Sequence, residues 1–478
     1  MKKYILALLV GMSFISAQTY VDALRLSNST YSTSPRTLGM SNTFVAVSND
    51  YYGSFFNPAG LGLMKYSQFV YDVNIDGNQN NTNFFNVRRN TFKKEFHSGN
   101  IGFAIPLPVR RGSMVVSFGY NTNTIFNNKF SFNGFNAGQN SYVQYLVSNN
   151  DKLAYDLGLS YPIYDSQNKI TGYGSIFNGR LQQSGTIEES GKISKYQFSA
   201  SVQVMPNIYV GGTLNIYSGN FKREKNYTEE DVMDVYPLGT LTDPAVPETN
   251  NFKYYTINDV LDWDLKGVDL KIGAIIKIKN NFNFGVTINL PTSFLIKETY
   301  LLNGSSFFEN NQGYNLNPQS YYTEYKISTP YKIAFGGASH FRNLTLTGQI
   351  EYIDYREMEF TSGLSTNERL KNNQDIDDLF REVLNFRFGA EFHPFRSGII
   401  LRAGLAYEPS PYLDDDPKYD KKFVSVGVGL VSSRNFTLDI GYMIGWWDDF
   451  VDNYDINYSR VYQKVSKHKL ALGLKYNF

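Results

Sequence analysis

Cysteine is absent from the 478 residues of the chain. Without it the chain cannot form disulfides, iron–sulfur clusters, thiolate zinc sites or a lipidated N-terminal cysteine. An excess of one sign of charge is also lacking, because the chain has 45 basic and 44 acidic side chains. A net charge of +1 provides no electrostatic footprint for nucleic acid, so we exclude that class of partner.

Tryptophan is rare, at 3 residues, although the chain contains 37 Tyr, 36 Phe and 39 Gly. Aromatic residues favour strands and glycine favours tight turns, so this composition indicates a β-rich protein. Long apolar runs are also missing. Beyond residue 17 no stretch approaches the roughly 18 consecutive apolar residues of a membrane-spanning helix.

The N-terminus has the features of a targeting segment. Lys2 and Lys3 provide a basic start, residues 4–15 are apolar, and Ala17 is a small residue suited to precede a cleavage site. So short an apolar stretch cannot cross a ~30 Å hydrocarbon core as a helix, which argues against a membrane anchor. We therefore expect a signal peptide over residues 1–17 and a mature protein outside the cytoplasm.

Apolar and polar residues alternate in several downstream segments. In residues 280–291, 343–352, 435–445 and 469–478 most apolar side chains lie at even positions, opposite polar or small ones. Period two over about ten residues is typical of a strand that crosses a bilayer at a tilt. A soluble sandwich also alternates, so this pattern leaves both classes open.

The lengths of the connections separate the two classes. Short turns at one end of the strands and long loops at the other are typical of an outer-membrane barrel, whereas a sandwich has no reason to sort them. The short polar connections are 205–207, 279–281, 341–343 and 432–435, and the long ones are 221–264, 303–320, 361–382, 409–421 and 448–460.

On this basis we predict an all-β fold, a transmembrane antiparallel β-barrel of about fourteen strands, over residues 63–478. Residues 179–189 also look like a strand, but counting them would reverse the order of short and long turns. We therefore assign residues 125–191 to one long extracellular loop and 221–264 to another. The predicted strands are 66–76, 95–107, 113–124, 192–204, 207–222, 265–279, 282–300, 321–339, 343–360, 383–394, 398–408, 421–432, 435–447 and 461–478.

A barrel of this size encloses more space than its own side chains fill. Residues 18–62, ahead of the first predicted strand, are rich in Ser, Thr and Asn and show no sustained period. We expect them to form a plug inside the lumen. A disordered periplasmic tail is the alternative.

The segment SPRTLGMSNTFVAVSNDYYGSFFNPAGLGLM, at residues 34–64, resembles the N-terminal plug signature of the FadL/TodX family of long-chain fatty acid and aromatic hydrocarbon transporters. Residues 328–360, 386–411 and 423–445 resemble further stretches of that family, in the same order. We expect the plug motif to shape the plug rather than contact ligand. The motif comprises Asn57, Pro58, Ala59, Gly60 and Leu61.

The resemblance implies a monomeric channel in the outer membrane of a Gram-negative bacterium, with no cofactor. In such a channel, external loops capture a hydrophobic small molecule, which passes the plug and leaves through the barrel wall. This route avoids water, which disfavours apolar solutes. The implied partners are that ligand, outer-membrane lipids, lipopolysaccharide and the outer-membrane insertion machinery.

Charged side chains on the predicted lumen face have two interpretations. They can pair with one another across the lumen, since both signs are present. Alternatively, Arg387 or Arg402 holds a ligand carboxylate, because the guanidinium fork fits that group. The inward-facing charges are Lys271, Glu351, Arg387, Glu391, Arg402 and Asp439.

Three features lie near the ends of the barrel. Trp446 and Trp447 are expected to anchor the outer interface, and Phe478 is expected to act as an assembly signal. A run of external carboxylates is solvated loop charge or, less simply, a calcium site, since calcium prefers oxygen ligands. The candidates are Asp448, Asp449, Asp452 and Asp455.

Two other functions remain open at this stage. A plugged barrel can serve as a non-transporting envelope scaffold or a secretion accessory. An outer-membrane phospholipase would use a Ser–His pair, and His468 lies on a predicted strand, but no local motif joins it to a serine. We therefore do not expect an enzyme.

Overall fold

The computed structural model describes residues 18–478 apart from 29–30, 32, 279–280, 310–311, 395–397, 433–434 and 455–457. The predicted signal peptide, residues 1–17, lies outside the described residues. No helix of the described chain has the length and apolar character needed to cross a membrane.

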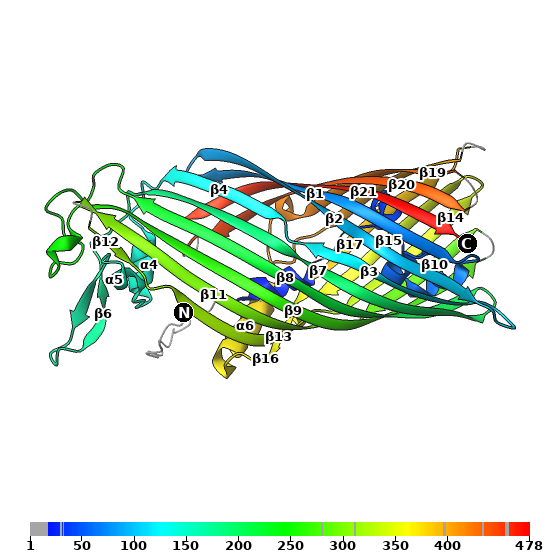
Figure 1. The fold of residues 1–478 in the computed structure, drawn as a ribbon, viewed down its shortest axis with the longest axis horizontal. Coiled ribbons are helices and arrows are strands. Elements are labelled where there is room, and N and C mark those ends of the chain that lie inside the picture. Colours follow the sequence, from blue (N-terminus) through cyan, green and yellow to red (C-terminus); the bar gives the residue numbers. More distant parts are fainter. Residues whose placement is uncertain are drawn as a thin grey trace, which may run out of the picture.

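Fourteen antiparallel strands close into a barrel, as predicted, because the first wall strand pairs with the last (Figure 1). Some wall strands are interrupted and carry two labels. In order around the wall they are β1 (Gln68–Phe84), β2 (Val87–Leu107), β3 (Met114–Ile125) with β4 (Asn128–Phe135), β7 (Gln182–Met205), β8 (Ile208–Glu230), β9 (Phe252–Ile278), β10 (Phe282–Asn289) with β11 (Ser293–Phe308), β13 (Gln319–Ser328) with β14 (Lys332–Phe341), β15 (Leu344–Asp354) with β16 (Glu359–Ser362), β17 (Glu382–Phe392), β18 (Ile399–Glu408), β19 (Lys421–Val431), β20 (Phe436–Asp452) and β21 (Arg460–Asn477).

The wall strands reach farther toward the long-loop end than the sequence predicted. Most of residues 179–189, which we assigned to a loop, belong to β7, and β7 pairs with both β4 and β8. The predicted loop 125–191 was therefore too long and shortens to 136–181. The predicted loop 221–264 likewise shortens to 231–251, because β8 and β9 extend into it.

Strand β9 shows why these extensions escaped the hydropathy pattern. Near the long-loop end Trp263 is buried inside the barrel and Asp264 faces outward. Farther along the same strand the two faces exchange polarity, so that Lys271 is buried inside and Ile272 is exposed outside. Because strand alternation continues without a break, the exchange marks the level at which water replaces lipid on the outer face.

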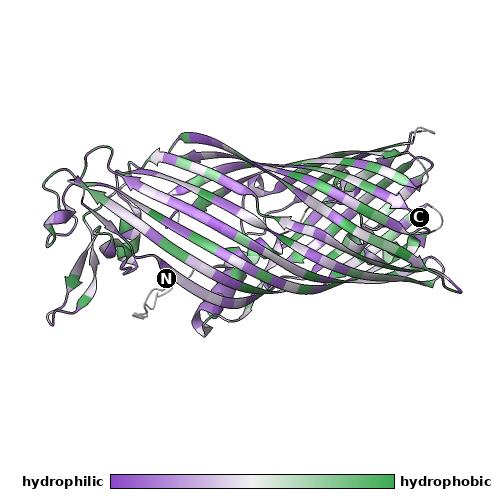
Figure 2. Ribbon diagram, in the orientation of Figure 1, coloured by the Kyte–Doolittle hydropathy of each residue, from purple (hydrophilic) through white to green (hydrophobic). Residues whose placement is uncertain are grey.

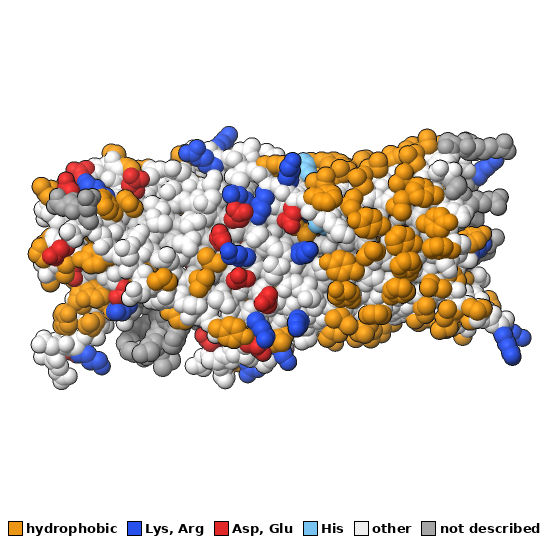
Figure 3. All heavy atoms as spheres, viewed as in Figure 1, with side chains coloured by type: hydrophobic (Ala, Val, Ile, Leu, Met, Phe, Trp, Pro, Cys, Tyr) orange, Lys and Arg blue, Asp and Glu red, His pale blue; other side chains and the backbone are white. Residues whose placement is uncertain are grey.

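The outer surface carries the same division. Apolar side chains cover the wall at the short-turn end, and charged side chains begin directly beyond this apolar belt (Figure 3). Hydrophobic and hydrophilic residues alternate in short bands along the strands (Figure 2). A wall that is apolar outside and polar inside over part of its height is the arrangement of a membrane barrel.

The N-terminal segment fills the lumen behind this belt, as predicted for a plug (Figure 1). Inward-facing glycines let its backbone lie directly on the strands: a Cβ at Gly441 would overlap the carbonyl oxygen of Pro35, and one at Gly211 would overlap Pro58. Its helices are α1 (Tyr20–Ser27), α2 (Pro35–Leu38), α3 (Gly53–Phe56) and the 3-10 helix η1 (Pro58–Leu63).

An aromatic-rich core fills the long-loop end of the barrel. It includes Phe130 and Phe132 of β4 and Trp263 of β9, so the barrel interior is apolar there. The connections at this end and the short elements between strands contain α4 (Tyr142–Ser148), α5 (Leu153–Asp156), β5 (Tyr161–Tyr164), β6 (Ile170–Gly174), η2 (Pro247–Thr249), β12 (Gly313–Asn315), η4 (Tyr355–Glu357), α6 (Thr366–Leu379) and η5 (Pro417–Tyr419).

A matched pair of leucines tests where the lipid ends. Leu472 on β21 and Leu301 on β11 both face outward and are each 41% exposed, but only Leu472 lies within the apolar belt. Leu472→Arg should destabilise the barrel by ~2–4 kcal/mol in urea unfolding from bilayers, whereas Leu301→Arg should cost close to nothing. Equal costs would contradict the assignment of the belt.

Candidate functional site

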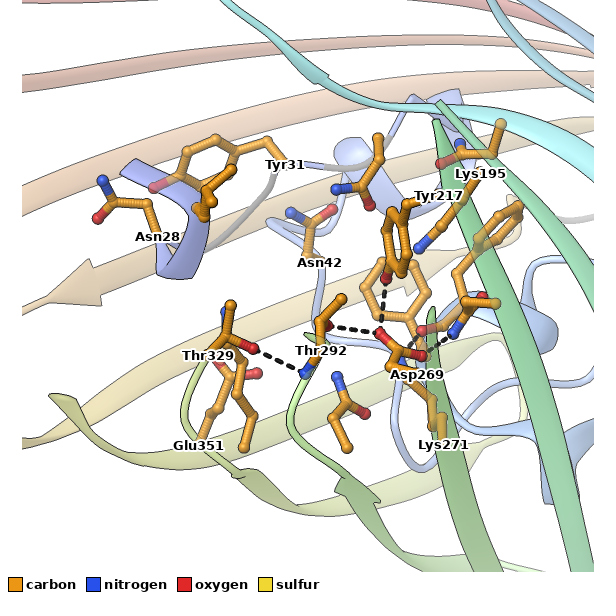
Figure 4. A pocket seen from close by; sticks show the side chains of 18 of the residues that line it. Asn28, Tyr31, Asn42, Lys195, Tyr217, Asp269, Lys271, Thr292, Thr329 and Glu351 are labelled. Atoms are coloured by element: carbon orange, nitrogen blue, oxygen red, sulfur yellow. Dashed lines mark hydrogen bonds between the residues drawn. The ribbon is translucent and has the colours of Figure 1, made fainter. Parts of the chain in front are cut away.

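A cavity of about 160 Å³ lies between the plug and the wall (Figure 4). The plug contributes Tyr31, Asn42 and Phe55 to its lining. The wall contributes residues from strands that lie far apart in sequence, among them Asn121, Lys195, Tyr217, Asp269, Lys271, Thr292, Phe294, Lys332, Glu351 and Arg387. The cavity is therefore enclosed by elements that only the closed barrel brings together.

Helix α1 roofs the cavity toward the long-loop end. Leu26 lines the cavity, and Lys332 Nζ donates to the carbonyl oxygen of Ser27 over 2.7 Å. Arg25 donates to Asp22 within the helix over 2.5 Å and to Glu189 of β7 over 3.2 Å, and the second contact holds the helix to the wall. Burial raises the pKa of Asp22, and the Arg25 guanidinium opposes that rise.

The cavity lining is rich in cations. It contains three lysines and Arg387 but only two carboxylates, Asp269 and Glu351. Glu351 is neutralised by Arg387, at 3.2 Å. Asp269 is saturated by neutral donors: Asn215 Nδ2 at 2.6 Å, the Tyr217 hydroxyl at 2.7 Å and the Thr292 hydroxyl at 2.9 Å.

Lys195 stands out among these cations. It is only 8% exposed, yet within the described part of the chain no carboxylate lies within 4.0 Å of its ammonium group. Its Nζ lies 5.4 Å from the ring centre of Phe55 and 5.8 Å from that of Tyr217. Lys271, by contrast, donates to the carbonyl oxygen of Phe55. An ammonium group held only by ring faces can accept an anionic partner.

The lumen charges predicted by alternation all lie inside the barrel. Arg402 donates to Glu391 over 2.8 Å and to Asp439 over 2.6 Å, and it does not line the cavity. Arg402 therefore pairs with other lumen charges and is not placed to bind a ligand in the cavity. Arg387 does line the cavity, but Glu351 and Glu408 engage its guanidinium.

The plug takes part in this charge network, which the sequence did not reveal. Arg36 donates to Asp50 over 2.6 Å within the plug and to Glu391 of β17 over 3.0 Å. The chain of ion pairs thus runs from the plug through Glu391 and Arg402 to Asp439. It fastens the plug to the wall.

None of the residues of the plug motif lines the cavity, although Phe55 and Phe56, directly before the motif, do. Asn57 is fully buried, and its Nδ2 donates to the carbonyl oxygens of Val45 and Ala274 over 2.9 and 3.0 Å. The next residues, Pro58, Ala59, Gly60 and Leu61, form most of η1. A Cβ at Gly60 would overlap Ser48, so this position requires glycine.

The residues predicted at the barrel ends lie in different environments. Trp446 is 43% exposed on the outer face, as an interface anchor requires. Trp447 was wrongly predicted as an anchor, because strand alternation turns it inward, where its ring lies 6.2 Å from that of buried Phe423. Phe478 is exposed, and its amide donates to Ser67 O over 2.9 Å.

The proposed calcium ligands do not converge. Asp448 and Asp449 are adjacent on β20 and so point to opposite faces, and Asp452 is held by Arg460 at 2.8 Å. Asp455 lies outside the described residues. Among the residues that the structure describes, no group of three or more His, Asp or Glu side chains is placed to hold a metal ion.

Some cavity residues were not predicted from the sequence, although strand alternation places them on the lumen face. Lys195 and Asp269 lie at inward positions of predicted strands, 192–204 and 265–279. Alternation does not predict the direction of Lys332, because the strand is interrupted between β13 and β14 and the alternation of inward and outward residues is not continuous there.

The fold and the plugged lumen define an outer-membrane β-barrel with a hatch inside it. The family of outer membrane protein transport proteins (OMPP1/FadL/TodX) matches residues 12–478. The chain belongs to this family, whose members are transporters and channels rather than enzymes. A comparison with curated protein sequences finds no match.

Solved structures share the fold of the chain. The FadL homologue of Pseudomonas aeruginosa superposes with a TM-score of 0.59 at 13% identity, over 94% of this chain and 100% of that one. The toluene transporter TodX of P. putida superposes with a TM-score of 0.58 at 11% identity, over 94% and 99%. At such low identity the likeness concerns the fold alone.

The ion pairs that fasten the plug lead to a test. Arg36→Gln leaves buried Asp50 with Lys475 at 3.8 Å and leaves Glu391 with Arg402, and it should destabilise the protein by about 3 kcal/mol in urea unfolding. It should also raise ion conductance across planar bilayers, because the plug loosens. Arg110→Gln, in an exposed turn, is the control and should change neither measurement. Unchanged conductance in Arg36→Gln would mean that other contacts hold the plug.

Proposed function

We propose that the protein takes up hydrophobic small molecules that carry an acidic head group, passively and across the outer membrane. Long-chain fatty acids are the class that fits best. The observation that carries this proposal is Lys195, a buried ammonium group that lines the cavity and has no carboxylate partner in the described chain.

The surroundings of Lys195 suit an amphiphile. A ligand carboxylate can accept hydrogen bonds from the Lys195 ammonium group, while Phe55 and Phe294 offer apolar surface in the same cavity. A neutral aromatic hydrocarbon has no group that would compensate the buried cation. The polar lining thus favours an acid over the toluene named for TodX.

The long-loop end supports capture from outside. Hairpin β5–β6 exposes Ile163, Tyr164 and Ile170, and the loop between β8 and β9 exposes Val232 and Met233. Apolar side chains exposed to water at this end offer a first binding surface for a hydrophobic molecule.

A break in the wall supports release sideways. Strand β3 pairs with β2 only up to Asn100 and bulges at Asn123, and β4 then lies inside the barrel. There the side chains of Asn80 and Thr82 on β1 donate to the carbonyl oxygens of Lys129 and Ser131 over 2.9 and 2.7 Å.

The upper part of β2 has one pairing strand and is otherwise contacted by side chains, such as Glu188, which pairs with Lys93 over 3.0 Å. Within the described residues, its segment 87–99 pairs with β1 alone. The cavity reaches this seam, since Asn121, Thr122 and Asn123 line it. Phe92 and Phe96 are exposed on the outer face beside the seam. A path from cavity to lipid at this level keeps an apolar molecule out of water.

The scaffold alternative has no observation in its favour beyond the shared fold. The phospholipase alternative has a Ser–His contact, since Ser466 Oγ lies 3.3 Å from His468 Nε2. The second ring nitrogen of His468 meets the Tyr442 hydroxyl at 2.8 Å rather than a carboxylate. The family is one of transporters, so we do not assign catalysis to this pair.

Lys195→Gln tests the ligand class. Loss of a charge-assisted hydrogen bond should weaken binding of a long-chain fatty acid to the purified barrel about tenfold. Binding of toluene, which has no charge, should not change. Lys371→Gln, on the exposed helix α6, is the matched control. Equal affinity of wild type and Lys195→Gln for the acid would contradict the proposal.

Deletion of Asn123 tests the exit. Removing the extra residue of the bulge allows β3 to continue along β2 and close the seam. Fatty acid binding in detergent should persist, whereas uptake from outside into lipid vesicles should fall about tenfold or more. Asn123→Ser keeps the bulge and should transport normally. Normal uptake in the deletion variant would place the exit elsewhere.

A further inference from the structure

A second cavity lies on the outside of the barrel, away from the lumen. It is a groove of about 530 Å³ lined by residues of β1, β2, β20, β21 and the 3-10 helix η5. It takes no part in the uptake route proposed above, and its occupant is argued from its own residues.

The strand register places the groove side chains in two rows on the outer face. In the first row, Lys464 of β21 lies between Asp448 of β20 and Asn81 of β1, and Asn81 lies opposite Asn90 of β2. Directly opposite side chains on neighbouring antiparallel strands have Cβ atoms about 5 Å apart. The row is therefore a continuous polar strip across four strands.

The second row lies two residues farther from the belt. Tyr462 of β21 stands between Phe450 of β20 and Asn83 of β1, and Asn83 lies opposite Arg88 of β2. Arg88 and Tyr462 are both exposed. This row adds a cation and aromatic faces to the amide groups of the first.

A third row, on the side of the first row that is nearer the apolar belt, shows how far the groove lies from the belt. It contains Trp446, Ser466, Gln79 and Phe92, in which Trp446 and Phe92 are exposed apolar rings. These rings form the rim of the apolar belt. At ~3.3 Å per residue along a strand, the groove begins about 7 Å beyond the rim. That is the level of the head groups in the outer leaflet.

Helix η5 forms the overhanging side of the groove. The ring of Tyr419 packs edge-on against Phe450, with centroids 5.6 Å apart, and Asp416 accepts a hydrogen bond from the amide of Lys418 over 2.9 Å. The groove is therefore shaped in advance of any binding, with Lys418 held above the two rows.

The outward cations of the groove have no ion pair in the described chain, although Lys418 Nζ lies 4.9 Å from the ring centre of Tyr419. Among the described residues no carboxylate lies within 4.0 Å of the charged nitrogens of Arg88, Lys418 or Lys464. On the outer face three cations, Arg88, Lys418 and Lys464, stand against one carboxylate, Asp448; Arg89 and Asp449 also border the groove, but strand alternation turns their side chains to the other face. The excess positive charge is available to an anionic ligand.

We infer that this groove binds the phosphorylated saccharide head group of a lipid in the outer leaflet. Phosphate is the anion that the Arg88 guanidinium and the two lysines would hold. The asparagine amides can donate to and accept from sugar hydroxyls. The position directly beyond the belt favours a head group that is anchored in the membrane over a soluble sugar phosphate.

The test uses the purified full chain in detergent, titrated with rough-type lipopolysaccharide. The double variant Arg88→Gln, Lys464→Gln should bind it at least about tenfold more weakly than the wild type. Lipopolysaccharide stripped of phosphate should bind the wild type as weakly as intact lipopolysaccharide binds the variant. Lys169→Gln, at the exposed tip of the β5–β6 hairpin, should bind like the wild type.

Heat-modifiable migration on gels checks that each variant is folded. If the double variant does not fold, Lys418→Gln outside the wall provides the same test, with a loss of about threefold expected. Equal affinity of variant and wild type, or of intact and dephosphorylated lipopolysaccharide, would overturn the inference. Equal or tighter binding of a soluble hexose phosphate would overturn the assignment to a membrane lipid.

Discussion

The bilayer leaves no water to satisfy an unpaired backbone group, and the rest of the structure depends on this constraint. The pairing of β1 with β21 closes the wall and removes its edges. Strand alternation then sends one set of side chains into lipid and the other into the lumen. Because the outward set is apolar over the belt, the polar residues gather inside, where Lys271, Glu391 and Arg402 need partners.

The plug seals the barrel and also provides ion-pair partners for the charged side chains of the lumen. Arg36 joins Asp50 of the plug to Glu391 of the wall, and Arg402 continues the chain to Asp439. Wall glycines let the plug backbone approach closely enough for these pairs to form. The cavity is what this fit leaves open, and its excess of cations follows from inward residues that the plug does not neutralise.

Breaks in the wall differ in whether they are repaired. Between β10–β11 and β13–β14, Thr292 and Thr329 exchange hydrogen bonds of 2.9 and 3.0 Å across the interruption. Above Gly99, β2 has no backbone pairing with β4 within the described residues, because β4 has turned into the lumen; side chains bridge the seam instead, as where Thr122 Oγ1 donates to Ser98 O over 2.7 Å. A seam without backbone pairing is a weak point of the wall, and the proposed exit route uses it.

The sequence alone determined the class of fold, the strand number and the faces within the belt, because lipid imposes period two on the side chains it touches. It did not determine how far strands such as β7 extend, since the outer face there meets water and the polarity of the two faces reverses. Nor did it show that Arg402 forms ion pairs with Glu391 and Asp439, whereas Lys195 has no carboxylate within 4.0 Å among the described residues. Which inward side chains meet depends on closure of the barrel and on the plug, and these bring together residues far apart in the chain.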